Sequence, residues 1–143
     1  ITKSISIKSF YVKNDEKENL INSSSRAMLN FGHTFGHAIE SMNNYKSNLT
    51  HGEAISIGMI IAATISYKLK YLPLGDLNKI KNHFASNKLP ISEKKMYNKK
   101  IFLIIQKNKK NIGGKINLVL LSKIGSAFLT NKISLENIKK IIK

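Results

Sequence analysis

The segment Arg26–Glu40, with the sequence RAMLNFGHTFGHAIE, decides how this chain folds and where its chemistry lies. The triplet His51-Gly52-Glu53 follows eleven residues later, so three of the chain's four histidines fall within nineteen positions. His33 and His37 are four residues apart, which on a helix places both imidazoles on one face about one turn apart. This spacing indicates either a metal site or a proton-transfer site.

A catalytic zinc ion takes three protein ligands from His, Glu or Asp and leaves one position open. Four residues of this region are candidate ligands: His33, His37, His51 and Glu53. The competing interpretation is that the His33 and His37 pair is structural, with both rings satisfied by hydrogen bonds, as isolated His-x3-His pairs more often are. Glu53 suits the first turn of a helix, where its charge complements the helix dipole, so His51 is the better ligand candidate of the triplet.

The neighbours of the histidine pair favour a functional interpretation. Gly32 and Gly36 each precede a histidine on the expected helix, where glycine is costly and is kept for the close approach of a ligand or a backbone. Asn30 and Arg26 lie three and seven residues before His33, so the same helical face presents an amide and a guanidinium. Such a face is a poor core and a good anion or metal site.

The rest of the chain predicts a mainly α, multi-helix domain with one small β-hairpin near the C-terminus. All 143 residues form a single domain in this prediction. Polar caps, prolines and apolar periodicity predict the elements. In the N-terminal half we expect a short amphipathic helix carrying Ile5, Ile7, Phe10 and Tyr11, a charged turn at 14–18, and a polar loop at 22–25 that caps one continuous helix through Ile39. A loop at 43–48 is expected next, followed by helices at 51–71, 73–87 and 92–106. The C-terminal part is expected to have a turn at Gly113-Gly114, strands at 115–122 and 127–130, and a final helix capped by Ser134.

Composition narrows the class of protein. A hydrophobic content of 42% is typical of a globular chain, and the absence of cysteine excludes disulfides and thiolate metal sites. The longest apolar run, Ile55–Ile65, is too short to span a bilayer, and no signal-peptide pattern opens the sequence, so a cytoplasmic protein is expected. The first residue is Ile and the opening segment has the pattern of a domain interior, which indicates a piece of a longer chain.

The formal net charge of +16 raises the alternative of a basic, helical nucleic-acid-binding module. However, Arg26 is the only arginine, and the lysines are scattered among Asn and Ile residues with no clustered Arg and aromatic motif. A Lys/Asn/Ile bias of the kind that an AT-rich genome imposes explains the charge better, so nucleic acid is not an expected partner.

The long motif of Arg26–Glu40, followed by His51-Gly52-Glu53-Ala54 and Gly58-Met59, resembles the signature of the 3-dehydroquinate synthase family. The resemblance covers essentially the whole chain and implies the mainly helical C-terminal domain of a two-domain, NAD- and metal-dependent carbon-oxygen lyase of the shikimate pathway. Its reaction closes 3-deoxy-D-arabino-heptulosonate 7-phosphate to 3-dehydroquinate and releases phosphate, through transient oxidation, elimination, re-reduction, ring opening and aldol closure. The NAD-binding domain is missing here, because no glycine-rich dinucleotide fingerprint occurs.

The resemblance also implies roles for individual residues. His33 and His51 become two ligands of zinc or cobalt, with a third ligand, a glutamate, in a segment upstream of Ile1, and His37 becomes a proton-transfer and substrate-binding group. Glu18 resembles a second acid/base position. The residues that resemble substrate-binding positions are Lys8, Arg26, Asn30 and Lys109, or Lys110 in place of Lys109.

Three departures from the family pattern affect these assignments. The stretch 19–25 is about four residues longer than the usual family spacing, which bears on the placement of Glu18 and Lys8. Asn108 stands where the family commonly has aspartate, and Thr50 where it commonly has leucine. None of the three changes touches the implied metal ligands.

Two enzyme alternatives remain open beside the synthase: another sugar-phosphate cyclase, or an iron-type alcohol or glycerol dehydrogenase relative. The resemblance further implies a homodimer for the complete enzyme. Without the NAD domain and the third ligand, residues 1–143 alone are predicted to be inactive and to bind zinc weakly.

Overall fold

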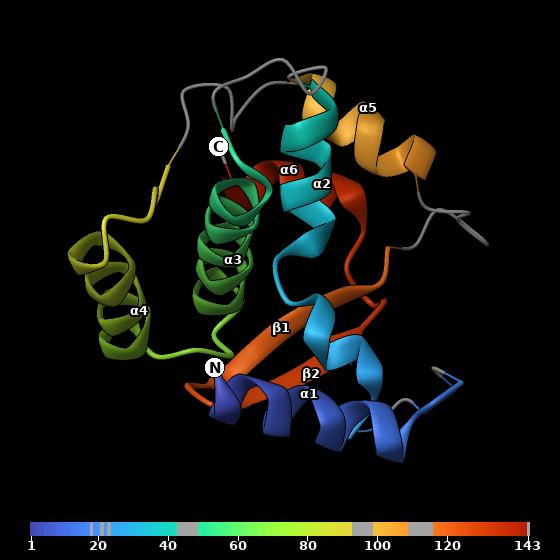
Figure 1. Ribbon diagram of the computed structural model, residues 1–143. Coiled ribbons are helices and arrows are strands. Elements are labelled where there is room, and N and C mark those ends of the chain that lie inside the picture. The colour runs from blue at the N-terminus through green and yellow to red at the C-terminus, as the bar shows by residue number, and fades with distance from the viewer. Residues whose placement is uncertain are drawn as a thin grey trace.

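The computed structural model describes residues 1–17, 19–20, 22, 24–42, 49–92, 99–108 and 116–142 of the chain (Figure 1). Its helices are α1 (Thr2–Asn14), the 3-10 helix η1 (Arg26–Asn30), α2 (His33–Met42), α3 (His51–Lys68), α4 (Leu74–Ser86), α5 (Lys99–Asn108) and α6 (Leu135–Ile142). Its strands are β1 (Leu118–Lys123) and β2 (Ser126–Thr130), which pair as an antiparallel hairpin. The predicted fold class, mainly α with one hairpin near the C-terminus, is confirmed.

Helix α3 forms the centre of the fold. It is apolar around most of its circumference, and its buried side chains include Ile57, Ile61 and Ile65, so neighbours can pack on every side of it. It contacts α2, α4, α6 and β1, and Figure 1 shows α2 running beside it. Within the described residues, no helix is long and apolar enough to cross a membrane.

A buried serine fixes the hairpin to α3. The Ser66 hydroxyl donates to the carbonyl of Ala62 at 2.8 Å and accepts from the amide of Leu121 on β1 at 3.0 Å. The hairpin pairs Leu118 with Thr130 and has an irregular register after Leu121. The buried face of β1 thereby joins the same core as α2 and α3.

The prediction of one continuous helix from residue 26 through Ile39 is wrong, because the structure has two helices there, η1 and α2. Ser25 accepts a hydrogen bond from the amide of Ala27 at 3.1 Å and caps η1, as predicted, but η1 ends at Asn30. Gly32 then has φ of +83°, a left-handed conformation that only glycine adopts at little cost. The chain turns at Gly32 and begins α2 at His33.

Helix α1 is longer than expected and is not amphipathic in the structure. None of its residues is buried, and the apolar side chains of Ile5 and Phe10 are 63% and 54% exposed. The apolar spacing therefore predicted the helix correctly and its burial incorrectly. Two other boundaries also differ from the prediction, since α3 ends at Lys68 and Ser92, the expected start of the next helix, lies outside a helix.

The other expected elements are observed, or fall in segments whose structure is not described. Helix α4 follows Pro73, α6 has its cap at Ser134, whose hydroxyl accepts from the amide of Asn137 at 3.2 Å, and both strands of the hairpin are present. The loop expected at 43–48 and the turn expected at Gly113-Gly114 lie outside the described residues.

The contact between α2 and α3 is made by glycine backbones. A β-carbon added to Gly58 of α3 would overlap the carbonyl oxygen of Gly32 and lie 2.7 Å from the amide nitrogen of Gly36. A β-carbon on Gly36 would in turn lie 3.0 Å from the α-carbon of Ile55. The predicted use of Gly32 and Gly36 for close backbone approach is therefore confirmed, and the close approach is to helix α3.

A second anchor connects the end of α1 to the start of η1. Asp15 is only 5% exposed, and its Oδ2 accepts from the amide of Arg26 at 3.0 Å. Its Oδ1 accepts from the amides of Asn19 and Leu20 at 2.8 and 3.2 Å. Burial alone would raise the pKa of this carboxyl, but the hydrogen bonds from the backbone of Arg26, Leu20 and Asn19 outweigh burial and hold the pKa below its ordinary value.

We predict that Gly58→Ala lowers the free energy of unfolding by at least about 2 kcal/mol, because the methyl group meets backbone atoms that cannot rotate away. The matched control is Gly75→Ala in α4, where an added β-carbon meets nothing within 4 Å. The control is expected to change stability by less than about 1 kcal/mol. Urea unfolding of both variants is the measurement, and equal stability of the two would contradict a tight contact.

Asp15 should make stability depend on pH in the acid range. Its pKa is lowered in the folded state, so its stabilising contribution is complete above the ordinary value of 3.8 and is lost as the pH falls through the lower folded value. We therefore expect Asp15→Asn to be less stable than the parent at neutral pH, with the difference shrinking below pH 3.8. Unfolding measured across this range checks the prediction. Asp76→Asn, whose carboxylate is 23% exposed and pairs with the 74% exposed Lys79 at 3.6 Å, is the control and should show a smaller effect.

Candidate functional site

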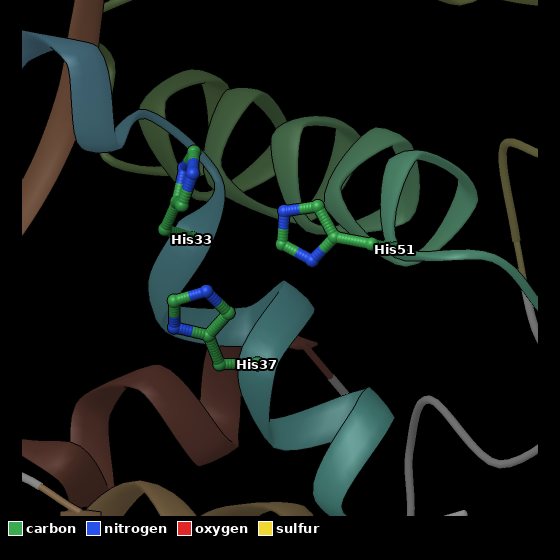
Figure 2. Close-up of side chains that lie close together, drawn as sticks. All are labelled: His33, His37 and His51. Atoms are coloured by element: carbon green, nitrogen blue, oxygen red, sulfur yellow. The ribbon is translucent and has the colours of Figure 1, made fainter. Parts of the chain in front are cut away.

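Three histidines converge at the N-terminal ends of α2 and α3. His33 is the first residue of α2, His37 lies one turn further along it, and His51 is the first residue of α3. Figure 2 shows the three rings facing one shared space. Each ring offers a nitrogen that lies within 4.8 Å of those of the other two, and the ring centroids are 5.3 to 6.2 Å apart. One divalent ion can therefore reach nitrogens from both helices.

The N-terminus of α3, which carries His51, is held by a capping box. The Glu53 carboxylate accepts from the amide and the hydroxyl of Thr50 at 2.7 and 2.8 Å, while the amide of Glu53 donates back to Thr50 Oγ1 at 3.3 Å. These hydrogen bonds from Thr50 lower the pKa of Glu53. Glu53 therefore acts as a cap, which confirms the preferred sequence interpretation over a ligand role.

The Nδ1 atoms of His51 and His33 lie next to hydrogen-bond acceptors. His51 Nδ1 lies 2.9 Å from Oε1 of Glu40, and His33 Nδ1 lies 3.4 Å from the carbonyl oxygen of Phe31. Carbonyl and carboxylate oxygens only accept hydrogen bonds, so these contacts place the protons on Nδ1 and leave the Nε2 lone pairs available. This is the usual arrangement of histidines that bind a metal, so the donor set fits zinc or a similar ion.

A cavity of about 550 Å³ adjoins the histidine cluster. His33 belongs to both, since the cavity is lined by Ser4, Ile7, Lys8, Arg26, Leu29, Asn30 and His33. These described lining residues include two cations and no carboxylate, so the cavity favours an anion. Amide, hydroxyl and imidazole groups beside the charges suit a ligand that also carries hydroxyl groups.

The structure brings together six of the eight residues that the sequence singled out. His33, His37 and His51 form one cluster, and Lys8, Arg26 and Asn30 line the adjoining cavity. The reason given for grouping Arg26 and Asn30 with His33 is wrong, because a turn at Gly32 separates η1 from α2. The remaining two, Glu18 and Lys109, lie outside the described residues, as does Lys110.

Sequence reasoning missed two residues that organise the site, Asp15 and Glu40. The sequence pattern predicts Asp15 only as part of a charged turn, but its carboxylate accepts a hydrogen bond from the amide of Arg26. The pattern gives Glu40 no role beyond the last position of the motif, but its carboxylate contacts His51. Its position three residues after His37 on the expected helix was a signal, because residues at this spacing share a helical face.

The family comparison covers most of the chain. Residues 1–111 match the model described as 3-dehydroquinate synthase C-terminal. A relative named 3-dehydroquinate synthase from Thermodesulfovibrio yellowstonii is 41% identical over 143 residues, which is 99% of this chain and 38% of the relative. One of the same name from Campylobacter jejuni is 41% identical over 138 residues, 96% of this chain and 38% of the relative. The chain thus spans about two fifths of such relatives.

Solved structures give the same result for the fold. A 2-epi-5-epi-valiolone synthase from Streptomyces hygroscopicus, with NAD+ and Zn2+ bound, superposes with a TM-score of 0.81 at 18% identity, over 99% of this chain and 38% of that one. A 2-deoxy-scyllo-inosose synthase complexed with carbaglucose-6-phosphate, NAD+ and Co2+ has a TM-score of 0.65 at 27% identity, over 89% of this chain and 35% of that one. The chain belongs to the 3-dehydroquinate synthase family and matches its C-terminal domain.

Proposed function

We propose that the protein containing this chain is a 3-dehydroquinate synthase, which converts 3-deoxy-D-arabino-heptulosonate 7-phosphate into 3-dehydroquinate and inorganic phosphate. The observation that carries the proposal is the cluster of His33, His37 and His51, which shares His33 with a cationic cavity. Family membership and relatives of that name, 36 to 41% identical to this chain, support it. The substrate carries a phosphate, a carboxylate and hydroxyl groups, which are the groups that such a cavity recognises.

In this proposal His33 and His51 hold the metal through Nε2, and a glutamate outside this chain completes the ligand set. Zinc or cobalt, when bound, supplies a Lewis acid that polarises the reacting hydroxyl and the ketone derived from it. His37, which is exposed and within reach of the same space, transfers protons to and from the substrate. Exposure allows His37 to exchange its proton with solvent between turnovers.

The cavity residues bind and orient the substrate. Arg26 offers a planar guanidinium that pairs with a carboxylate or phosphate through two hydrogen bonds, and Lys8 adds a point charge. Asn30 provides an amide for a hydroxyl group. The anchor from Asp15 to the amide of Arg26 places the start of η1, and Arg26 Nη1 also donates to the carbonyl of Glu16 at 3.3 Å.

Other parts of the proposal concern residues or partners beyond the described structure. Glu18 is proposed as a further acid/base group, and Lys109 as a ligand of the substrate's phosphate. An N-terminal domain is proposed to bind NAD, which supplies the hydride acceptor and donor of the reaction. We also propose that the complete enzyme is a cytoplasmic homodimer, and that residues 1–143 form its single metal- and substrate-binding domain.

The second candidate function is that of another sugar-phosphate cyclase. It is favoured by the structural likeness to 2-deoxy-scyllo-inosose synthase, whose complex contains a sugar-phosphate analogue, NAD+ and Co2+. Two cations in one cavity suit a substrate that has both a carboxylate and a phosphate, which favours the heptulosonate. The same cations count against the alcohol or glycerol dehydrogenase alternative, whose substrates are uncharged.

We expect the full-length protein, supplied with NAD and zinc, to release one phosphate for each 3-dehydroquinate formed from the heptulosonate phosphate. A chelator should abolish turnover and added zinc or cobalt should restore it, because the bound ion is the Lewis acid that polarises the substrate in this proposal. Phosphate release and product formation are measured in parallel. Residues 1–143 alone should show no turnover, and absence of phosphate release by the complete protein would remove the synthase assignment.

Lys8 and Lys13 offer a matched pair on one helix. Lys8 lines the cavity, whereas Lys13 is exposed near the end of α1 and does not. We expect Lys8→Ala to raise KM for the heptulosonate phosphate about tenfold or more, the cost of losing a hydrogen bond to a charged group. Lys13→Ala should leave KM within about twofold, since an exposed charge outside the site contributes little. Equal effects would mean that only net charge attracts the substrate.

A further inference from the structure

The geometry points to Glu40 as a positioning residue for the metal site, an inference that rests on the proposed function. Glu40 lies near the end of α2, and its side chain is 16% exposed. Its Oε1 lies 2.9 Å from Nδ1 of His51, the first residue of α3. We propose that Glu40 accepts the Nδ1–H hydrogen bond, keeps that proton on Nδ1 and aims Nε2 of His51 at the ion.

His51 depends on such a partner more than His33 does. The side chain of His51 is 60% exposed, so packing alone does not fix its rotamer. His33 is half-buried, and its Nδ1 faces the carbonyl of Phe31 in the adjoining turn. A hydrogen bond to a carboxylate is stronger than one to a neutral carbonyl, and it joins His51 to the neighbouring helix. Glu40 thereby supplies the orientation that burial does not.

Charge gives Glu40 a second effect on the site. The imidazole ligands of this chain are neutral when they bind a metal, so they do not reduce the charge of a divalent ion. A carboxylate behind an imidazole makes the ring a more basic ligand and strengthens the bond to the metal. Within the described part of the chain, the other carboxylate beside the cluster, Glu53, is engaged by Thr50. Glu40 is therefore the carboxylate placed to act through His51.

The test is metal affinity in the full-length protein, measured by competition with a chelator for Zn2+ and by titration with Co2+. We expect Glu40→Ala to weaken binding about 10- to 100-fold and to change the visible absorption of bound Co2+, because the ring is no longer held. Glu40→Gln, whose amide oxygen still accepts a hydrogen bond without the charge, should fall between Glu40→Ala and the parent. Glu136→Gln, an exposed carboxylate in the first turn of α6, is the control and should bind like the parent.

A purely structural role for Glu40 predicts a different result. In that case the metal-free variants would lose stability, while metal affinity and the Co2+ spectrum would match the parent, and the inference would be overturned. If the parent releases phosphate and the variants bind metal normally, only the role of Glu40 fails. If the parent binds neither Zn2+ nor Co2+, the proposed function fails with it.

Discussion

The close approach of two helix backbones is the constraint on which the rest of this structure depends. Gly58 of α3 lies directly against the carbonyl of Gly32 and the amide of Gly36. The N-terminal part of α2 therefore contacts α3 without an intervening side chain. Because His33 and His37 occupy the first two turns of α2, and His51 begins α3, this contact brings three imidazoles within one ion's reach. A wider helix spacing would separate the donors by the width of at least one side chain.

The cationic cavity beside the histidines is positioned by a different and more polar contact, the carboxylate of Asp15. The buried carboxylate of Asp15 accepts hydrogen bonds from the amides of Asn19 and Leu20, which follow α1, and from the amide of Arg26, which begins η1. Lys8 comes from α1 and Asn30 from η1, and both line one cavity with His33. The glycine contact and the Asp15 anchor involve different residues. The first positions the start of α2, where His33 lies, and the second positions Arg26, which lines the same cavity as His33. The cationic cavity and the histidine cluster are thereby connected through a single residue, His33, at the start of α2.

Local signals in the sequence were sufficient for much of the fold. Polar caps predicted at Ser25 and Ser134 mark helix starts that the structure has, whereas the cap at Thr50 is seen only in the structure. The break at Gly32 was missed because a glycine inside an apolar helical pattern does not reveal its backbone angle, which here is a φ of +83° at a close contact with Met59 of α3. The exposure of α1 was missed for a similar reason, since periodicity shows which residues share a face but not what covers it.

For the site, too, the sequence predicted what local spacing determines and missed contacts between elements. Residues close in sequence, such as His33 and His37, were grouped correctly from spacing, and the resemblance to a known family supplied the remaining assignments. Glu40 and His51 are eleven residues apart in the sequence, and their contact becomes visible only when α2 and α3 are placed side by side. The contacts of the imidazoles support the metal-ligand roles proposed for His33 and His51. His33 and His51 are held through Nδ1 by acceptors on α2 or its preceding turn, as metal ligands need to be. The exposure of His37 is compatible with the proposed proton transfer, but His51 is exposed as well, so the two proposed roles are distinguished by the family resemblance and not by burial.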